Sequence, residues 1–320
     1  MIRVGILGCS DIARRKFIPA LRNSRQARLV AVAGRQRERA AVLAADLSAN
    51  AMTYEELVST PAVDLLYISL PNHLHEEWSI RALEQGKHVI CEKPLGLCLA
   101  AVMRMLEVAD RHGRLLFENV MYLQHPQHML VKDLLSSGRI GRTLSLRSEF
   151  AFPGPPPGDF RLDPAMGGGA YNDMNRYPLS AALYFLDGKE HRFCHGSEEI
   201  RDGLTISFQA DSSTDSGESF SFMTAFGLPY RSFYTISGEV GEITVERAFT
   251  TPAEMENRIR VTAHGRDESF NAPASDHFLN TIEHVCGLIQ CGEWRAEHLQ
   301  ARRLAALADL FHDNCMRRYE

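Results

Sequence analysis

The chain has 320 residues, of which 45% are apolar and 23% charged, and its formal net charge is −5 at pH 7. This balance is typical of a well-cored globular protein, and the length indicates about two domains. No block of basic residues and no run of 18 apolar residues occurs, which argues against nucleic-acid binding and against a membrane span. The seven cysteines are scattered and no leader peptide is recognisable, so we expect a cytoplasmic protein with reduced thiols.

The first 120 residues alternate short apolar runs with stretches of helical spacing. The first and third runs are apolar throughout, so we expect strands covered on both faces, which is typical of a parallel, doubly wound sheet. The predicted strands are residues 2–7, 29–33, 65–70, 88–91 and 115–118, and the predicted helices are residues 12–23, 37–47, 74–85 and 99–111.

After residue 122 the apolar residues follow a period of two, which indicates strands with one covered face. We therefore predict an α/β protein with a Rossmann-type doubly wound parallel sheet over residues 1–122. Residues 123–320 are predicted to form an α+β domain with an open, mostly antiparallel sheet. The predicted strands there are residues 143–152, 204–208, 218–226, 233–236, 241–246 and 258–263, and the predicted closing helices are residues 276–288 and 296–317.

The turn after the first strand, G-C-S-D-I-A at residues 8–13, is a degenerate form of the dinucleotide motif G-x-G-x-x-G. Small residues there let the backbone approach a pyrophosphate at the helix N-terminus, where unpaired N–H groups favour an anion. The position of this turn between a strand and a helix favours dinucleotide binding over an ordinary tight turn. The candidate cofactor-binding residues are Gly8, Cys9, Ser10, Asp11 and Ile12.

The end of the second strand indicates which dinucleotide is bound. Proteins that bind NAD usually have an acidic residue there, which accepts hydrogen bonds from the ribose 2′-hydroxyl. Here the strand is followed by Gly34 and Arg35, and the first acidic residue is Glu38. A guanidinium at this place would pair with a 2′-phosphate, so we predict NADP(H) rather than NAD(H), with Arg35 as a ligand.

Two motifs follow the ends of later strands: P-N-H-L-H at residues 71–75 and E-K-P at residues 92–94. In a doubly wound sheet, ligands bind at these carboxyl ends. A G-G-G motif at residues 167–169 and the pair Asp173 and Tyr177 follow in order. With these motifs the chain resembles, over essentially its whole length, the glucose–fructose oxidoreductase/inositol dehydrogenase family.

This resemblance implies a role for each matching residue. It implies that Lys93 contacts both cofactor and substrate and takes part in catalysis, and that Asp173 and Tyr177 bind the substrate in the second domain. It also implies that the nicotinamide end of the cofactor is bound by Leu70, Pro71, Asn72, His75 and Glu92.

The chain departs from the family at Tyr177, where most members have histidine. A free tyrosine ionises near pH 10 and is protonated at neutral pH, which suits it to donate a proton and favours ketone reduction over alcohol oxidation. The members with tyrosine at this place resemble nucleotide-sugar 3-ketoreductases of deoxysugar biosynthesis, and segments 119–128 and 158–161 resemble that group as well. Asn175 and Arg176 are further departures, from glycine and from an apolar residue.

The substrate is therefore predicted to be a sugar with a ring ketone, linked to a nucleoside diphosphate. Tyr122, Lys93, Asp173 and Tyr177 are candidate substrate ligands. Arg161 follows a proline-rich loop and is a candidate for binding the diphosphate, because phosphates favour planar bidentate donors; an ordinary loop arginine is the alternative.

His125 and His128 lie three residues apart, which is compatible with a metal site. Because no third ligand of fitting spacing stands out, we predict no metal and expect these histidines to line the substrate pocket or to make structural hydrogen bonds.

We therefore predict an NADPH-dependent ketoreductase with Tyr177 as proton donor and Lys93 polarising the carbonyl. The family resemblance implies a homodimer or homotetramer formed through the outer face of the second sheet. Two alternatives remain: a free-sugar, polyol or inositol dehydrogenase that works toward oxidation, and a catalytically silent dinucleotide-binding regulator.

Overall fold

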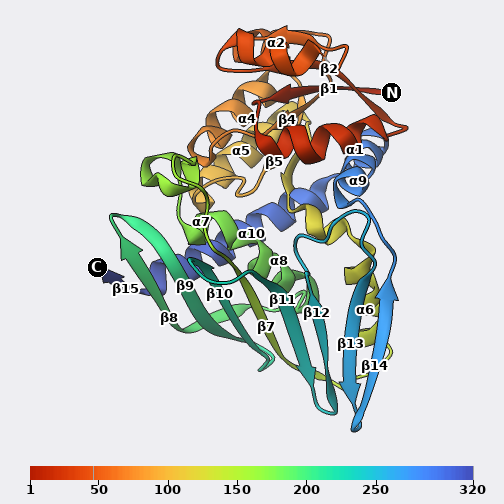
Figure 1. Ribbon diagram of the computed structural model, residues 1–320, viewed down its shortest axis with the longest axis vertical. Coiled ribbons are helices and arrows are strands. Elements are labelled where there is room, and N and C mark those ends of the chain that lie inside the picture. The colour runs from red at the N-terminus through yellow and green to blue at the C-terminus, as the bar shows by residue number, and fades with distance from the viewer. Residues whose placement is uncertain (46, 320) are drawn as a thin grey trace. The chain divides into compact units, whose positions relative to one another are not determined.

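The computed structural model describes residues 1–45 and 47–319 (Figure 1). The chain forms two compact units, each with its own sheet. The six-stranded unit contains Met1–Met121 and His277–Ala305, and the nine-stranded unit contains Tyr122–Asp276 and the chain from Ala306 onward. The units are thus discontinuous in sequence. That residues 1–122 bind the cofactor and residues 123–320 bind the substrate stays a prediction.

The six-stranded sheet is parallel throughout, with the order β3-β2-β1-β4-β5-β6, so the predicted doubly wound fold is confirmed. Its strands are β1 (Ile2–Leu7), β2 (Ala27–Ala33), β3 (Asn50–Met52), β4 (Leu65–Ile68), β5 (His88–Glu92) and β6 (Leu116–Asn119). Strand β4 is buried along its whole length, as its apolar run predicts for a strand covered on both faces.

The helices of this unit follow the predicted alternation. They are the π-helix Ala13–Phe17, α1 (Ile18–Arg22), α2 (Arg37–Ala45), α3 (Tyr54–Ser59), the 3₁₀ turn Asn72–Leu74, α4 (His75–Glu84), α5 (Leu99–His112), α9 (His277–Cys291) and the first part of α10 (Arg295–Asn314). The predicted helix over 37–47 includes residue 46, which lies outside the described residues.

Three local features of this unit differ from the prediction. The predicted regular helix over 12–23 contains a π-helical stretch before Pro19, which has no amide hydrogen to donate to the Arg15 carbonyl. Strand β3 was not predicted, because its three residues, Asn-Ala-Met, form no apolar run. Helix α3 was missed too, although Thr53 and Glu56 form a capping box at its start.

The nine-stranded sheet has the order β14-β13-β12-β11-β7-β10-β9-β8-β15 and is mostly antiparallel, as predicted. Two pairs are parallel, β7 with β10 and β8 with β15. The strands are β7 (Thr143–Phe152), β8 (His191–Arg201), β9 (Leu204–Thr214), β10 (Ser219–Phe226), β11 (Arg231–Gly238), β12 (Gly241–Glu246), β13 (Asn257–Ala263), β14 (Arg266–Ala272) and β15 (Met316–Tyr319).

The unpredicted strands of this sheet are β8, β14 and β15. Their sequences are polar and lack the alternation that identified their neighbours. The predicted helix over 296–317 was too long at its end, because α10 stops at Asn314 and the chain continues as β15.

One face of the nine-stranded sheet is covered by helices (Figure 1). Phe311 of α10 packs on Phe220 and Phe222 of β10, with ring centroids 6.0 and 5.0 Å apart, so the alternating phenylalanines of β10 belong to the core. The helical segments between β6 and α9 are the 3₁₀ turn Met121–Gln124, α6 (Pro126–Ser136), the 3₁₀ turns Phe160–Leu162 and Pro164–Met166, α7 (Ala170–Met174) and α8 (Arg176–Phe185). The end of α10 also belongs to this unit. No helix in the described part of the chain is long and apolar enough to cross a membrane.

His88, at the start of β5, predicts acid sensitivity of the six-stranded unit. Its Nδ1 accepts the Leu115 amide hydrogen at 3.0 Å, and burial, with nearby Arg114, lowers its pKa to about 4. Between pH 6.5 and pH 4 the unfolded chain therefore binds a proton that the folded chain does not, so the free energy of unfolding falls as the pH falls through this window.

We expect His88→Gln to reduce this pH dependence by up to about 3 kcal/mol, from about 1.4 kcal/mol per pKa unit. Urea denaturation at pH 7 and pH 4 measures it, with His112→Gln on the exposed side of α5 as control. Equal acid sensitivity of wild type and His88→Gln would contradict the assignment.

Candidate functional site

The turn after β1 has the geometry that a pyrophosphate site needs. Gly8 has φ = +111°, and a Cβ there would lie 2.9 Å from the Ser69 carbonyl oxygen, so only glycine fits. Ser10 Oγ accepts the Ala13 amide hydrogen at 3.1 Å and caps the first helical turn, while Cys9 and Asp11 are exposed. The backbone of this turn is therefore accessible at a helix start, which fits an anionic group.

The end of β2 keeps an arginine accessible. Arg35 is exposed, and Gly34 before it has no room for a side chain, because a Cβ would lie 2.9 Å from the Gln36 carbonyl oxygen. The neighbouring Arg37 is paired with Glu56 at 3.3 Å. Arg35 is therefore accessible to solvent, and its pairing with a 2′-phosphate stays a prediction.

The P-N-H-L-H motif begins where β4 ends. Pro71 is partly buried, Leu70 and Asn72 are buried, and His75 opens α4 with no exposed surface. The His75 ring nitrogens Nδ1 and Nε2 each lie 2.8 Å from a carbonyl oxygen, of Pro94 and Leu70 respectively. Burial lowers the pKa of His75, so the neutral ring is favoured and donates to one of these acceptors at a time. His75 thus connects the end of β4 to the E-K-P loop.

The E-K-P loop leaves the end of β5 and is held by buried side chains. Glu92 Oε1 accepts hydrogen bonds from the Tyr67 hydroxyl and the Asn119 amide, each at 2.6 Å. Burial raises the pKa of Glu92, and these two donors and Lys93 oppose that rise. Lys93 is joined to Pro94 by a cis peptide bond.

Glu118 holds the next part of this loop. Its Oε1 accepts the Leu95 amide hydrogen at 2.9 Å, and its side chain is buried. No role was predicted from the sequence for Tyr67 or Glu118. The signal for both was a polar side chain inside an otherwise apolar strand run.

In the nine-stranded unit, Tyr177 lies in α8 within an aromatic cluster. Tyr177 is 6% exposed, and its ring packs against Phe150, Phe249 and Tyr122, with centroids 4.7, 5.4 and 5.8 Å apart. The Tyr122 hydroxyl donates to the Tyr177 carbonyl oxygen at 3.0 Å and contacts Ser180 Oγ at 2.9 Å. Tyr122 is fully buried, so it supports the backbone that carries Tyr177.

Asp173 lies in α7, one short segment before Tyr177. Asn175 separates α7 from α8, and Pro178 offers no amide hydrogen to the Met174 carbonyl. The unusual residues at this break pair with each other: both are buried, and Arg176 Nη1 donates to Asn175 Oδ1 at 3.0 Å.

Arg161 and Asp173, both predicted as substrate ligands, lie together. Arg161 Nε donates to Asp173 Oδ1 at 3.1 Å, and Nη1 donates to both carboxylate oxygens of Asp159 at 3.1 and 3.2 Å. Burial opposes the charge of Arg161, but the two carboxylates outweigh it and raise its pKa. Two negative charges therefore already neutralise the guanidinium.

The G-G-G motif closes this loop. The Gly169 amide donates to the Arg161 carbonyl oxygen at 2.9 Å, and a Cβ on Gly168 would lie 2.5 Å from the same oxygen. Only glycine at position 168 allows this approach, so the motif fixes Arg161 next to the start of α7.

His125 and His128 have structural partners. His125 Nδ1 accepts the Gln127 amide hydrogen at 3.2 Å, and His128 Nδ1 contacts the Tyr234 hydroxyl at 2.9 Å. No group of three or more His, Cys, Asp or Glu side chains suited to a metal occurs among residues 1–45 and 47–319.

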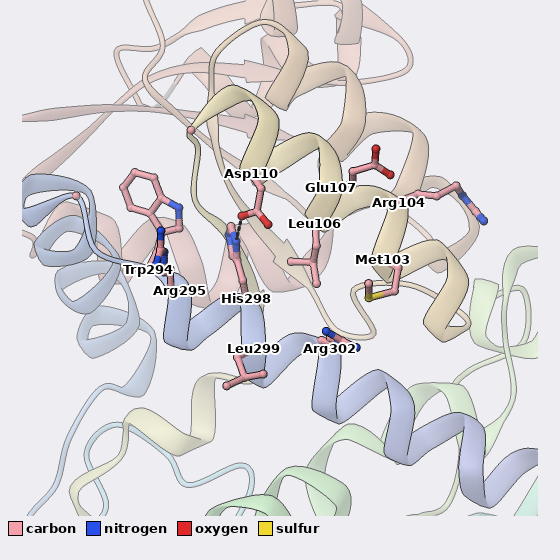
Figure 2. A pocket seen from close by; sticks show the side chains of 12 residues that line it. Met103, Arg104, Leu106, Glu107, Asp110, Trp294, Arg295, His298, Leu299 and Arg302 are labelled. Carbon is pink, nitrogen blue, oxygen red and sulfur yellow. Dashed lines mark hydrogen bonds and ion pairs between the residues drawn. The ribbon is translucent and has the colours of Figure 1, made fainter.

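The six-stranded unit also has a groove of about 900 Å³ between α5 and the start of α10 (Figure 2). Its floor carries His298, whose Nδ1 donates to Asp110 at 2.8 Å while Nε2 accepts the Leu116 amide hydrogen at 3.1 Å. None of the residues predicted from the sequence to bind cofactor or substrate lines this groove.

Two family models match the chain. The model described as an oxidoreductase family with an NAD-binding Rossmann fold matches residues 2–120, and that of the GFO/IDH/MocA C-terminal domain matches residues 128–267. The dTDP-3,4-didehydro-2,6-dideoxy-α-D-glucose 3-reductase of Saccharopolyspora spinosa is 35% identical over 91% of this chain and 88% of its own. The D-xylose 1-dehydrogenase (NADP⁺) 2 of Haloferax volcanii is 29% identical over 90% and 89%.

Among solved structures, KijD10, a 3-ketoreductase from Actinomadura kijaniata in complex with NADP and TDP-benzene, superposes with a TM-score of 0.96. It is 33% identical and the match covers 100% of this chain and 99% of that one. Variants of KijD10 with one tyrosine changed to phenylalanine and with one lysine changed to alanine match with TM-scores of 0.96 and 0.93. This chain belongs to the glucose–fructose oxidoreductase/inositol dehydrogenase (GFO/IDH/MocA) family of oxidoreductases.

Proposed function

We propose that this protein is an NADPH-dependent 3-ketoreductase that reduces a ring ketone of a dTDP-linked deoxysugar. The observation that carries the proposal is the full-length match to KijD10, whose complex contains NADP and TDP-benzene. The tyrosine and the lysine substituted in the KijD10 variants lie as many positions apart as Lys93 and Tyr177 do here. This equal spacing supports Lys93 and Tyr177 as the catalytic pair.

The cofactor would be held by the residues at the carboxyl ends of β1, β2, β4 and β5. The glycine turn at residues 8–12 would hold the pyrophosphate, and Arg35 would pair with the 2′-phosphate. Pro71, Asn72, Glu92 and Lys93 would bind the nicotinamide end, with Leu70 and His75 supporting them. NADPH, when bound, supplies the hydride.

The chain's own residues then handle the carbonyl oxygen and its proton. The Lys93 ammonium polarises the ketone C=O, so the carbon accepts hydride more readily. Tyr177 gives its hydroxyl proton to the carbonyl oxygen as the C–H bond forms, which completes a secondary alcohol. The aromatic cluster around Tyr177 keeps water away and fixes its ring.

Asp173 would accept a hydrogen bond from a sugar hydroxyl, oriented by Arg161. Because two carboxylates neutralise Arg161, its contacts support this positioning role over the predicted binding of the diphosphate. The exposed face of the nine-stranded sheet, which carries Arg147 and Arg231 around the buried Glu149 carboxylate, is our proposed face for a homodimer or homotetramer.

A free-sugar dehydrogenase is the second candidate, supported by the similarity to the D-xylose dehydrogenase of Haloferax volcanii. NADPH consumption with dTDP-3,4-didehydro-2,6-dideoxy-α-D-glucose, and NADP⁺ reduction with D-xylose and myo-inositol, separate the two. We expect turnover with the dTDP-sugar alone. Turnover with the free sugars alone would assign the dehydrogenase function, and no turnover with any of them would favour a regulator.

Arg35→Ala should lower kcat/KM for NADPH by about ten- to a hundredfold and leave that for NADH nearly unchanged, because it removes a charged partner of the 2′-phosphate alone. Steady-state kinetics with both cofactors measures this, with Arg37→Ala as control, since Arg37 is already paired with Glu56. A wild type that uses both cofactors equally well would contradict the NADPH assignment.

Tyr177→Phe should lower kcat by 10²–10⁴-fold, about 3–5 kcal/mol of barrier, and leave NADPH affinity unchanged. Tyr184→Phe is the matched control, because Tyr184 lies on the same helix with its ring under Lys132. If Tyr177→Phe keeps more than about a third of wild-type kcat in single-turnover experiments, Tyr177 is not the proton donor. Lys93→Met abolishing turnover in that case would assign the donor to Lys93.

A further inference from the structure

Tyr67 is a fully buried tyrosine in the middle of the parallel sheet. Its ring stacks on Phe17, with centroids 3.6 Å apart and planes 2° from parallel, and its neighbours in β4 are leucine and isoleucine. A phenylalanine would fill this space equally well. The hydroxyl therefore needs its own explanation, because a buried polar group is costly unless it is hydrogen-bonded.

The hydroxyl reaches the Glu92 carboxylate at 2.6 Å, and Asn119 Nδ2 reaches the same oxygen at 2.6 Å. Asn119 is fully buried, and within the described residues its Oδ1 has no hydrogen-bond partner. The Asn119 side chain is thus oriented so that its Nδ2 donates to Glu92, although its Oδ1 then accepts no hydrogen bond from the described residues. Two donors converging on one carboxylate oxygen are suited to an ionised carboxylate.

Glu92 directly precedes Lys93, and opposing effects act on it. Burial raises the pKa of Glu92, while Tyr67, Asn119 and the charge of Lys93 oppose that rise. The rest of the loop has separate supports, since His75 contacts the Pro94 carbonyl and Glu118 accepts the Leu95 amide hydrogen. Loss of the Tyr67 hydroxyl would therefore affect the carboxylate and leave the backbone of the loop in place.

We propose that Tyr67 is a positioning residue, whose hydroxyl fixes the Glu92 carboxylate beside Lys93. The Lys93 ammonium group is thereby held in place to polarise the ketone. This rests on the role of Lys93 proposed above. Tyr67 itself acts through Glu92, and Asn119 is its partner in the same task.

The test is Tyr67→Phe, which keeps the stacked ring and removes only the hydroxyl. We expect kcat for the dTDP-ketosugar to fall about tenfold, with KM for NADPH unchanged. Without the donor, Glu92 takes up a proton more readily, so the acidic limb of the kcat–pH profile should shift to higher pH. Asn119→Ala should shift it in the same direction, and Tyr230→Phe, at an exposed tyrosine of the nine-stranded unit, should not.

A second measurement does not depend on turnover. Carbon-13 NMR of labelled glutamate carboxyls, with Glu92→Gln to assign the signal, follows the protonation of Glu92 directly. We expect it to titrate at higher pH in Tyr67→Phe than in wild type. An unchanged titration, or a shifted titration with an unchanged kcat–pH profile, would overturn the proposal. A wild type inactive on the ketosugar would instead refute the proposed function, while the NMR titration would still show whether Tyr67 controls Glu92.

Discussion

A loop that carries a lysine must be held still at the carboxyl edge of a buried parallel sheet, and the polar contacts around residues 92–95 meet this constraint. Glu92 is bound by donors from two neighbouring strands, the Pro94 carbonyl faces His75, and the Leu95 amide binds Glu118. Each contact satisfies a group that would be costly to bury alone. Because β5 lies between β4 and β6, donors from both neighbours reach its end.

In the nine-stranded unit, a glycine holds a loop in place beside a polar side chain. The loop before α7 folds back so closely that a single Cβ on Gly168 would collide with the backbone. This approach places Arg161 against Asp173, whose carboxylate is then oriented before any ligand arrives. Preorganised polar groups cost no rearrangement when a ligand binds, which suits Asp173 to the role proposed for it above.

The sequence predicted features that depend on local pattern. The apolar run of β4, the glycine turn after β1 and the period-two strand β10 lie where their spacing indicated. Strands with polar or very short sequences were not predicted, as β3, β8 and β14 show.

Contacts between segments that lie far apart in the chain could not be predicted from the sequence either. Nothing in the order of residues says that Tyr67 reaches Glu92, or that Asp159 and Asp173 share Arg161, because these pairs form only when strands and loops are placed in space. Nor does the sequence show that both ring nitrogens of His75, a residue predicted to bind the cofactor, face backbone carbonyl oxygens.

The most direct measurement of the central claim is the transfer of label from NADPH deuterated at both C4 positions of the nicotinamide to the dTDP-linked ketosugar, followed by NMR of the product. Hydride transfer to the ring ketone predicts deuterium at C3 of the sugar, with one NADPH consumed per product molecule. A product without deuterium at C3, or label that appears only in a free sugar, would contradict the account.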